Sequence, residues 1–237
     1  MITTILFDLD GTLLPMDEEL FIKTYLGGLV KTMAPFGYEP DQLVKTIWKG
    51  MQAMVQNDSS KTNEQVFWDV YASVYGDDKR KDVDLFADYY NAHYVQTKIA
   101  CGFNPQVPPM VQSLLQRGLN VVIATNPFFP AVATRQRIQW AGLDPNSFNL
   151  FTTYENSRHC KPNLDYYRDI LHQLGVDPSQ CIMVGNDAQE DMIASELGIK
   201  VFLLTDNLIN KQNLPIDHYP QGNVDDLVNF LNSQLNG

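Results

Sequence analysis

Two carboxylates follow a short apolar segment near the beginning of the chain. Residues 3–7 are apolar or β-branched, which predicts a buried strand. Asp8 and Asp10 come directly after this strand, and Gly11 permits the sharp turn that would keep both side chains at its carboxyl end. Open α/β sheets bind ligands at that end, so the pattern indicates a nucleophile and a metal site.

The spacing Asp-x-Asp-Gly-Thr, which ends at Thr12, is specific enough to carry weight. Four fixed positions match by chance in roughly one of several hundred chains of this length, before any structural context is required. The alternative interpretation is an ordinary turn, because Asp and Gly are favoured in turns for local reasons. The predicted strand ahead of the match favours the chemical interpretation.

Two later segments place anion-binding groups after a predicted strand or before a predicted helix. The strand expected at 120–125 ends in the Thr125 hydroxyl and leads into Asn126, although a threonine there could equally cap the next turn. Lys161 precedes Pro162, which suits the first position of a helix, and a cation there can reach an anion held at the helix N-terminus. A solvent-exposed lysine is the alternative.

A third segment carries acidic residues after a strand. Residues 181–184 predict a buried strand, and a glycine turn leads to a helix expected at 188–197. Asp187 and Asp191 stand four residues apart at the start of that helix and would share one face. Glu190 is an alternative partner for Asp187. The helix dipole offers a purely local explanation, because it favours acids at a helix N-terminus.

In order and spacing, these segments resemble the four motifs of the haloacid dehalogenase superfamily, in particular its phosphatase branch. The resemblance implies that Asp8 attacks phosphorus and that Asp10 works as general acid and base. It implies that Thr125 and the backbone N–H of Asn126 bind the phosphate. Lys161 would bind the phosphate too and balance the charge of Asp8. The dehalogenase branch usually lacks the second Asp, so Asp10 favours phosphoryl transfer.

The same resemblance assigns a metal ion to the carboxylates of Asp8 and Asp187 and to the backbone carbonyl of Asp10. Asp191 and Thr12 would take supporting positions. Electrostatics favours a cation there, because two carboxylates ~4 Å apart repel by about 4 kcal/mol at an effective dielectric constant near 20. An all-oxygen site with few protein ligands suits Mg²⁺, which retains several waters and accepts a phosphate oxygen. Mg²⁺ is therefore the expected cofactor.

The elements that must position these residues alternate along the second half of the chain. Helices are expected at 107–117, 131–140, 163–174, 188–197 and 224–235, and strands at 120–125, 149–153, 181–184 and 200–204. Such alternation predicts an α/β fold with a doubly wound, mostly parallel, Rossmann-like sheet and right-handed crossovers.

A helical block separates the first strand from the rest of this fold. Apolar residues at helical spacing predict helices at 20–33, 40–55, 63–75 and 82–95. The strand at 3–7 needs the later strands to form a sheet, so the block is interpreted as an insertion. We expect an α-helical cap domain at 16–103 within a discontinuous catalytic core of residues 1–15 and 104–237.

Composition narrows the class of protein further. At 237 residues and 44% hydrophobic content, the chain can bury a full core and a smaller second domain. A net charge of −11 argues against nucleic acid or an anionic membrane as partner. Cys101, Cys160 and Cys181 are widely spaced, which indicates reduced thiols. The chain shows neither an apolar run of about 18 residues nor a secretion signal, so a cytoplasmic location is expected.

The leading hypothesis for function is a Mg²⁺-dependent phosphatase that hydrolyses a small phosphomonoester through an aspartyl phosphate. The expected partner is a small phosphorylated metabolite. A phosphomutase or other phosphotransferase is the alternative with the same chemistry, and a catalytically silent binding module on this fold is the alternative from another class. The four motif acids and Lys161 weigh against the silent module. The identity of the substrate, the cap residues that select it and the oligomeric state do not follow from the sequence.

Overall fold

The computed structural model describes residues 1–235, and within them the strands form one six-stranded sheet of order β3-β2-β1-β4-β5-β6. The strands are β1 (Thr4–Phe7), β2 (Asn120–Ile123), β3 (Leu150–Phe151), β4 (Cys181–Gly185), β5 (Lys200–Leu204) and β6 (Gln221–Gly222). Every neighbouring pair is parallel. The predicted doubly wound, Rossmann-like α/β fold is therefore confirmed.

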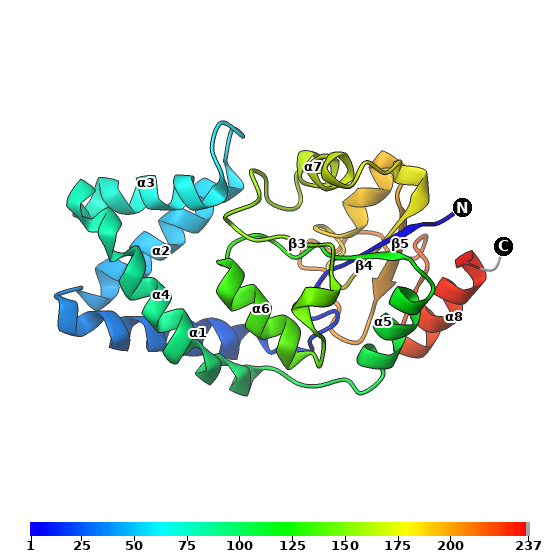
Figure 1. The fold of residues 1–237 in the computed structure, drawn as a ribbon, viewed down its shortest axis with the longest axis horizontal. Coiled ribbons are helices and arrows are strands. Elements are labelled where there is room, and N and C mark those ends of the chain that lie inside the picture. The colour runs from blue at the N-terminus through cyan, green and yellow to red at the C-terminus, as the bar shows by residue number, and fades with distance from the viewer. Residues whose placement is uncertain (236–237) are drawn as a thin grey trace.

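Each face of the sheet is covered by helices, as strands that are apolar on both sides require. Ile5 and Phe7 of β1 point into one core, which includes apolar residues of α5 (Val107–Gln116), α6 (Ala131–Trp140) and α8 (Val224–Leu235). Leu6 points the other way, into a core with α7 (Leu164–Leu174). Figure 1 shows α7 on one side of the sheet and α5 with α8 on the other. Alternate side chains of β1 thus hold the sheet between two helical layers.

The chain between β1 and α5 is helical and lies to one side of the sheet (Figure 1). Its elements are α1 (Glu18–Met33), η1 (Ala34–Phe36), α2 (Pro40–Val55), α3 (Asn63–Tyr75), η2 (Asp77–Asp82), α4 (Val83–Ala92) and η3 (Tyr94–Ala100), where η denotes a 3₁₀ helix. Met16 and Cys101 pair across the two connections to the sheet, so both connections run side by side. The division into a core and a cap remains a prediction.

Several predicted boundaries agree with the structure, and others need correction. α2, α3 and α8 have the predicted limits. The strand expected at 149–153 is shortened to β3, and the helix expected at 82–95 is divided into α4 and η3. The helix expected at 188–197 is wrong, because turns occupy 188–191 and only η6 (Met192–Leu197) follows. Two further 3₁₀ segments are η4 (Pro145–Ser147) and η5 (Pro178–Gln180). Every helix within residues 1–235 is too short or too polar to cross a membrane.

Candidate active site

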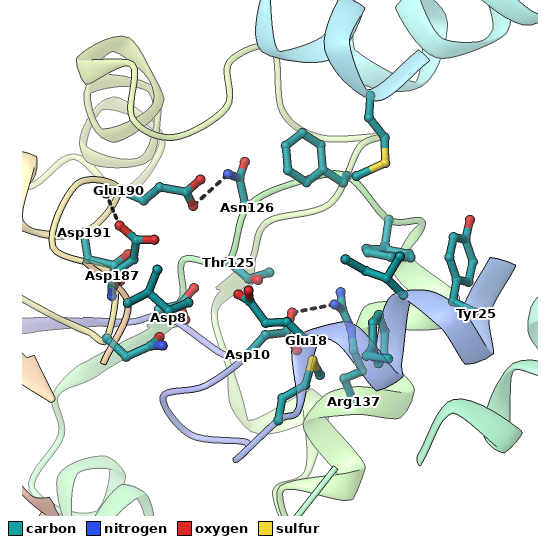
Figure 2. A pocket seen from close by; sticks show the side chains of 18 of the residues that line it. Asp8, Asp10, Glu18, Tyr25, Thr125, Asn126, Arg137, Asp187, Glu190 and Asp191 are labelled. Atoms are coloured by element: carbon teal, nitrogen blue, oxygen red, sulfur yellow. Dashed lines mark hydrogen bonds and ion pairs between the residues drawn. The ribbon is translucent and has the colours of Figure 1, made fainter. Parts of the chain in front are cut away.

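The predicted residues meet where the strand order changes direction. β1 and β4 are neighbours, and the sheet continues through β2 on one side and β5 on the other, which opens a crevice beyond their carboxyl ends. Asp8 follows β1 and Asp187 follows β4, and both line a cavity of about 420 Å³. Asp10, Thr125 and Asp191 line the same cavity (Figure 2).

Lys161 is a buried cation between two carboxylates. Its Nζ atom lies 2.9 Å from Asp8 Oδ1 and 2.6 Å from Asp191 Oδ1, and its side chain is 1% exposed. Burial alone would lower the pKa of Lys161, but the carboxylates of Asp191 and Asp8 outweigh burial and raise that pKa well above its usual range. The ammonium group stays charged at neutral pH, and the alternative of a solvent-exposed lysine is wrong.

The second oxygen of Asp8 contacts Thr12, the residue that the resemblance places in a supporting position, and Thr12 also contacts Asn186. The Thr12 hydroxyl lies 3.0 Å from Asp8 Oδ2 and 2.8 Å from Asn186 Oδ1, so it shares one hydrogen between two acceptors. Asn186 is buried and donates through Nδ2 to the carbonyl of Asn207. Gly11 has a φ of +83°, and a Cβ atom there would lie 2.4 Å from Asn186 Nδ2. The glycine of the motif thus makes room for Asn186.

Asp191 braces the loop that follows β4. While Oδ1 contacts Lys161, Oδ2 accepts a hydrogen bond from the Asp187 backbone N–H at 2.9 Å. A Cβ atom at Gly185 would lie 2.0 Å from Asp191 Oδ2, so glycine is required for this approach. The carboxylate therefore caps a backbone donor, and it folds 188–191 into turns instead of the expected helix.

Asp187 and Glu190 occupy different environments within this loop. Asp187 Oδ1 accepts from the backbone N–H groups of Gln189 and Glu190, at 2.8 and 2.9 Å. Glu190 Oε2 accepts from Asn126 Nδ2 at 2.9 Å, and burial raises the pKa of Glu190 to about 7. The structure thus places Asp191, not Glu190, against Lys161.

Asp10 is held by an arginine that sequence reasoning missed. Arg137 Nη1 of α6 lies 2.5 Å from Asp10 Oδ2, and the arginine side chain is 2% exposed. The guanidinium also lies over the ring of Phe129, 4.5 Å from its centroid. Burial raises the pKa of Asp10 to about 6, although Arg137 opposes that rise. A carboxyl group with such a pKa can give and take a proton near neutral pH.

The oxygen ligands available here fit a hard divalent cation. Across residues 1–235, three or more His, Cys, Asp or Glu side chains are nowhere grouped closely enough to hold a metal by themselves. The expected set needs only two such side chains, Asp8 and Asp187, since its third oxygen is the carbonyl of Asp10. Both carboxylates line one cavity, together with further acids, so the site offers hard oxygen donors and an excess of negative charge.

A model of the haloacid dehalogenase-like hydrolase family matches residues 2–195. The chain belongs to this family. It is accordingly a hydrolase, and the resemblance drawn from the motifs is confirmed. Its curated relatives include a protein named pyrophosphatase PpaX from Bacillus cereus, 26% identical over 200 residues that cover 84% of this chain and 81% of the relative. The PpaX of Bacillus velezensis is 25% identical with the same coverage.

Solved structures place this haloacid dehalogenase-like hydrolase among proteins of the same fold. A 2-haloacid dehalogenase from Pseudomonas syringae superposes with a TM-score of 0.67 and 18% identity, over 99% of this chain and all of the other. A predicted phosphoglycolate phosphatase from Haemophilus somnus gives a TM-score of 0.57 and 19% identity, over 98% of each chain. At these identities the similarity concerns the fold alone, so the reaction has to be argued from the site.

Proposed function

We propose that this hydrolase is a Mg²⁺-dependent phosphatase that acts on a small phosphomonoester. One observation carries this proposal: two carboxyl groups line the same cavity, and each is held by different partners. Asp8 is held by Lys161 and Thr12, while Asp10 is held by Arg137 and its pKa is raised to about 6 by burial. A nucleophile and an acid are the two groups that stepwise hydrolysis of a phosphate ester requires.

The proposed reaction has two steps. The Asp8 carboxylate attacks phosphorus, the ester P–O bond breaks, and Asp10 gives its proton to the leaving alcohol oxygen. Water then attacks the aspartyl phosphate, Asp10 takes up a proton from that water, and Asp8 is released with inorganic phosphate. Lys161 and the polar groups of Thr125 and Asn126 offset the negative charge that develops on the phosphoryl oxygens.

A bound Mg²⁺ would neutralise phosphate charge during both steps. Asp8 and Asp187 would hold it through their carboxylates, and Asp10 through its backbone carbonyl. Residues 16–103 would act as a cap that closes on the cavity and excludes water before the first step. We keep the cytoplasm as the expected location and a small phosphorylated metabolite as the expected partner.

Removal of the divalent metal is expected to stop phosphate release. In Mg²⁺ buffer, a panel of phosphorylated metabolites should include at least one that releases inorganic phosphate. Treatment with EDTA should reduce that rate by at least about 100-fold, because a bound metal contributes several kcal/mol to charge stabilisation. Adding Mg²⁺ back should restore the rate.

The same panel separates the alternatives. Equal phosphate release in EDTA would contradict the metal assignment. An isomerised phosphate ester in place of free phosphate would identify a phosphomutase. Halide release from haloacids would identify a dehalogenase, and an absence of any product would favour the silent module.

Asp10 and Arg137 predict a particular pH dependence. Asp10 must be protonated to act on the leaving group, so kcat/KM should fall about tenfold per pH unit above pH 6. Arg137→Gln removes the cation that opposes the rise in the pKa of Asp10. The fall in kcat/KM should therefore begin at a higher pH in this variant. Arg137→Lys retains the charge and serves as the matched control. Coincident pH profiles for all three proteins would contradict the role of Asp10 as acid, provided that thermal melts show folded variants.

A further inference from the structure

The cavity has two ends of opposite chemistry. The carboxylates of Asp8, Asp187 and Glu190 gather at one end, and Tyr25 lies at the other (Figure 2). The cavity lining includes an apolar and aromatic wall built by three segments that are distant in sequence, and Met51, Phe128 and Phe129 of this wall border Tyr25. The wall consists of Ile22 and Leu26 of α1, Trp48 and Met51 of α2, and Phe128 and Phe129 after β2. We call these six residues the apolar wall.

The basic side chains that line the cavity are already engaged with acids. They are Arg137 and Lys211 among the residues that the structure describes. Arg137 is held by Asp10, and Lys211 Nζ lies 3.1 Å from Glu18 Oε2 while its side chain is 78% exposed. Glu18 itself adds a negative charge to the rim of the cavity.

The two lysines of α2 add no cation to the cavity. Lys45 and Lys49 share a face of that helix, but both are exposed to solvent and neither lines the cavity. An anionic group on the leaving half of a substrate would therefore meet apolar side chains and carboxylates. Burial of a charge without a paired partner is strongly unfavourable.

Two residues of the apolar wall are unusually exposed for their type. Ile22 is 40% exposed and Trp48 is 44% exposed, and both face the cavity from neighbouring helices. A ring placed against them would remove apolar surface from water, and an aromatic side chain favours a flat, polarisable partner. A volume of about 420 Å³ is within the range that accommodates a small ligand with one ring system.

We infer that the preferred substrate is a phosphomonoester of an uncharged aromatic alcohol, whose ring lies against the apolar wall. This inference rests on the proposed function, because it assigns the phosphate to the carboxylate end of the cavity. It differs from what the names of the relatives would suggest. Pyrophosphate and phosphoglycolate both carry a second anionic group. Within residues 1–235, the cations that reach the cavity, Arg137 over the Phe129 ring and Lys211, are already paired with Asp10 and Glu18.

Four phosphate esters of simple alcohols test this inference without the bias that a good leaving group introduces. Benzyl phosphate and 1-naphthylmethyl phosphate carry uncharged rings, ethyl phosphate lacks a ring, and 4-carboxybenzyl phosphate adds a negative charge to the benzyl ring. We expect kcat/KM for benzyl phosphate to exceed that for ethyl phosphate by about 10-fold or more. It should exceed that for 4-carboxybenzyl phosphate by a similar factor, and that for pyrophosphate by about 100-fold.

A charge placed in the apolar wall should change this order. Ile22→Lys introduces a cation at an exposed position that lines the cavity, so it should raise kcat/KM for 4-carboxybenzyl phosphate and lower it for benzyl phosphate. Leu20→Lys is the matched control, since Leu20 is 37% exposed on the same helix and does not line the cavity. The inference is overturned if pyrophosphate or the carboxybenzyl ester is hydrolysed as well as benzyl phosphate. The inference is also overturned if Ile22→Lys and Leu20→Lys change kcat/KM for the two esters equally.

Binding separates a failure of this inference from a failure of the proposed function. Calorimetry with benzylphosphonate and phosphonoacetate needs no turnover. Tighter binding of benzylphosphonate to a protein that hydrolyses none of the esters would refute the phosphatase while supporting the apolar wall. Tighter binding of phosphonoacetate would refute the inference, whether or not phosphate is released.

Discussion

Asp8→Asn is expected to abolish phosphate release, with a loss of at least about 10³-fold in kcat. An amide cannot attack phosphorus, whereas its shape preserves most of the contacts that Asp8 makes. The fold should tolerate the change, because Lys161 retains Asp191 as an ionic partner at 2.6 Å. Inorganic phosphate release from the best substrate of the panel, measured with purified protein in Mg²⁺, gives the comparison.

A second measurement ties this loss to the covalent step. Wild-type protein quenched in acid during turnover should carry one phosphoryl group on the peptide that contains Asp8, and the variant should not. Asp17→Asn is a suitable control, since it removes an exposed carboxylate that caps α1 and does not line the cavity. Residual activity of more than a few per cent in Asp8→Asn, with a confirmed sequence and an unchanged thermal melt, would refute the nucleophile assignment.

The sequence predicts the structure best where local chemistry decides it. β1, β2 and β4 are continuous apolar segments that only a buried parallel sheet accommodates, and their ends place Asp8, Thr125 and Asp187 together. The capping box of α3, formed by Thr62 and Gln65, is likewise a local pattern, and that helix begins as predicted.

The missed features depend on contacts between distant parts of the chain. Arg137 sits in a helix without a clear apolar face, and only the approach of α6 to β1 turns it into a partner for Asp10. Asn186 separates the glycine and the acid of the fourth motif, and its contact with Thr12 exists only after β1 and β4 pair. The helix expected at 188–197 was wrong for the same reason, since one oxygen of Asp191 contacts the distant Lys161 while the other accepts the Asp187 backbone N–H.

Loss of the buried ammonium should have the largest effect on stability. Lys161→Met leaves the carboxylates of Asp8 and Asp191 close together, with side chains that are 11% and 1% exposed. Removing one partner from a buried ionic cluster typically costs about 3–5 kcal/mol of unfolding free energy. Urea unfolding at pH 7 measures this loss, and Lys49→Met, which removes a solvent-exposed lysine, should change the free energy of unfolding by less than about 0.5 kcal/mol.

The pH dependence of the stability of Lys161→Met follows from the acids that remain. Burial raises the pKa of Asp191 and Lys161 opposes that rise, so loss of the lysine raises the pKa further. A carboxyl group whose pKa is higher in the folded state binds its proton more tightly there, so stability is retained at acid pH and lost as the pH rises toward the folded value. The deficit relative to the wild type should therefore be larger at pH 8 than at pH 5.

A neutral residue in place of Asp191 should recover part of the stability that Lys161→Met loses. In Lys161→Met combined with Asp191→Asn, the asparagine oxygen can still accept the Asp187 N–H, but the repulsion with Asp8 is gone. We expect the double variant to be more stable at pH 8 than Lys161→Met alone, which a double-mutant cycle with Asp191→Asn quantifies. Equal stability of the two proteins, or a deficit that is independent of pH, would show that Lys161 stabilises the fold by packing and not by its charge.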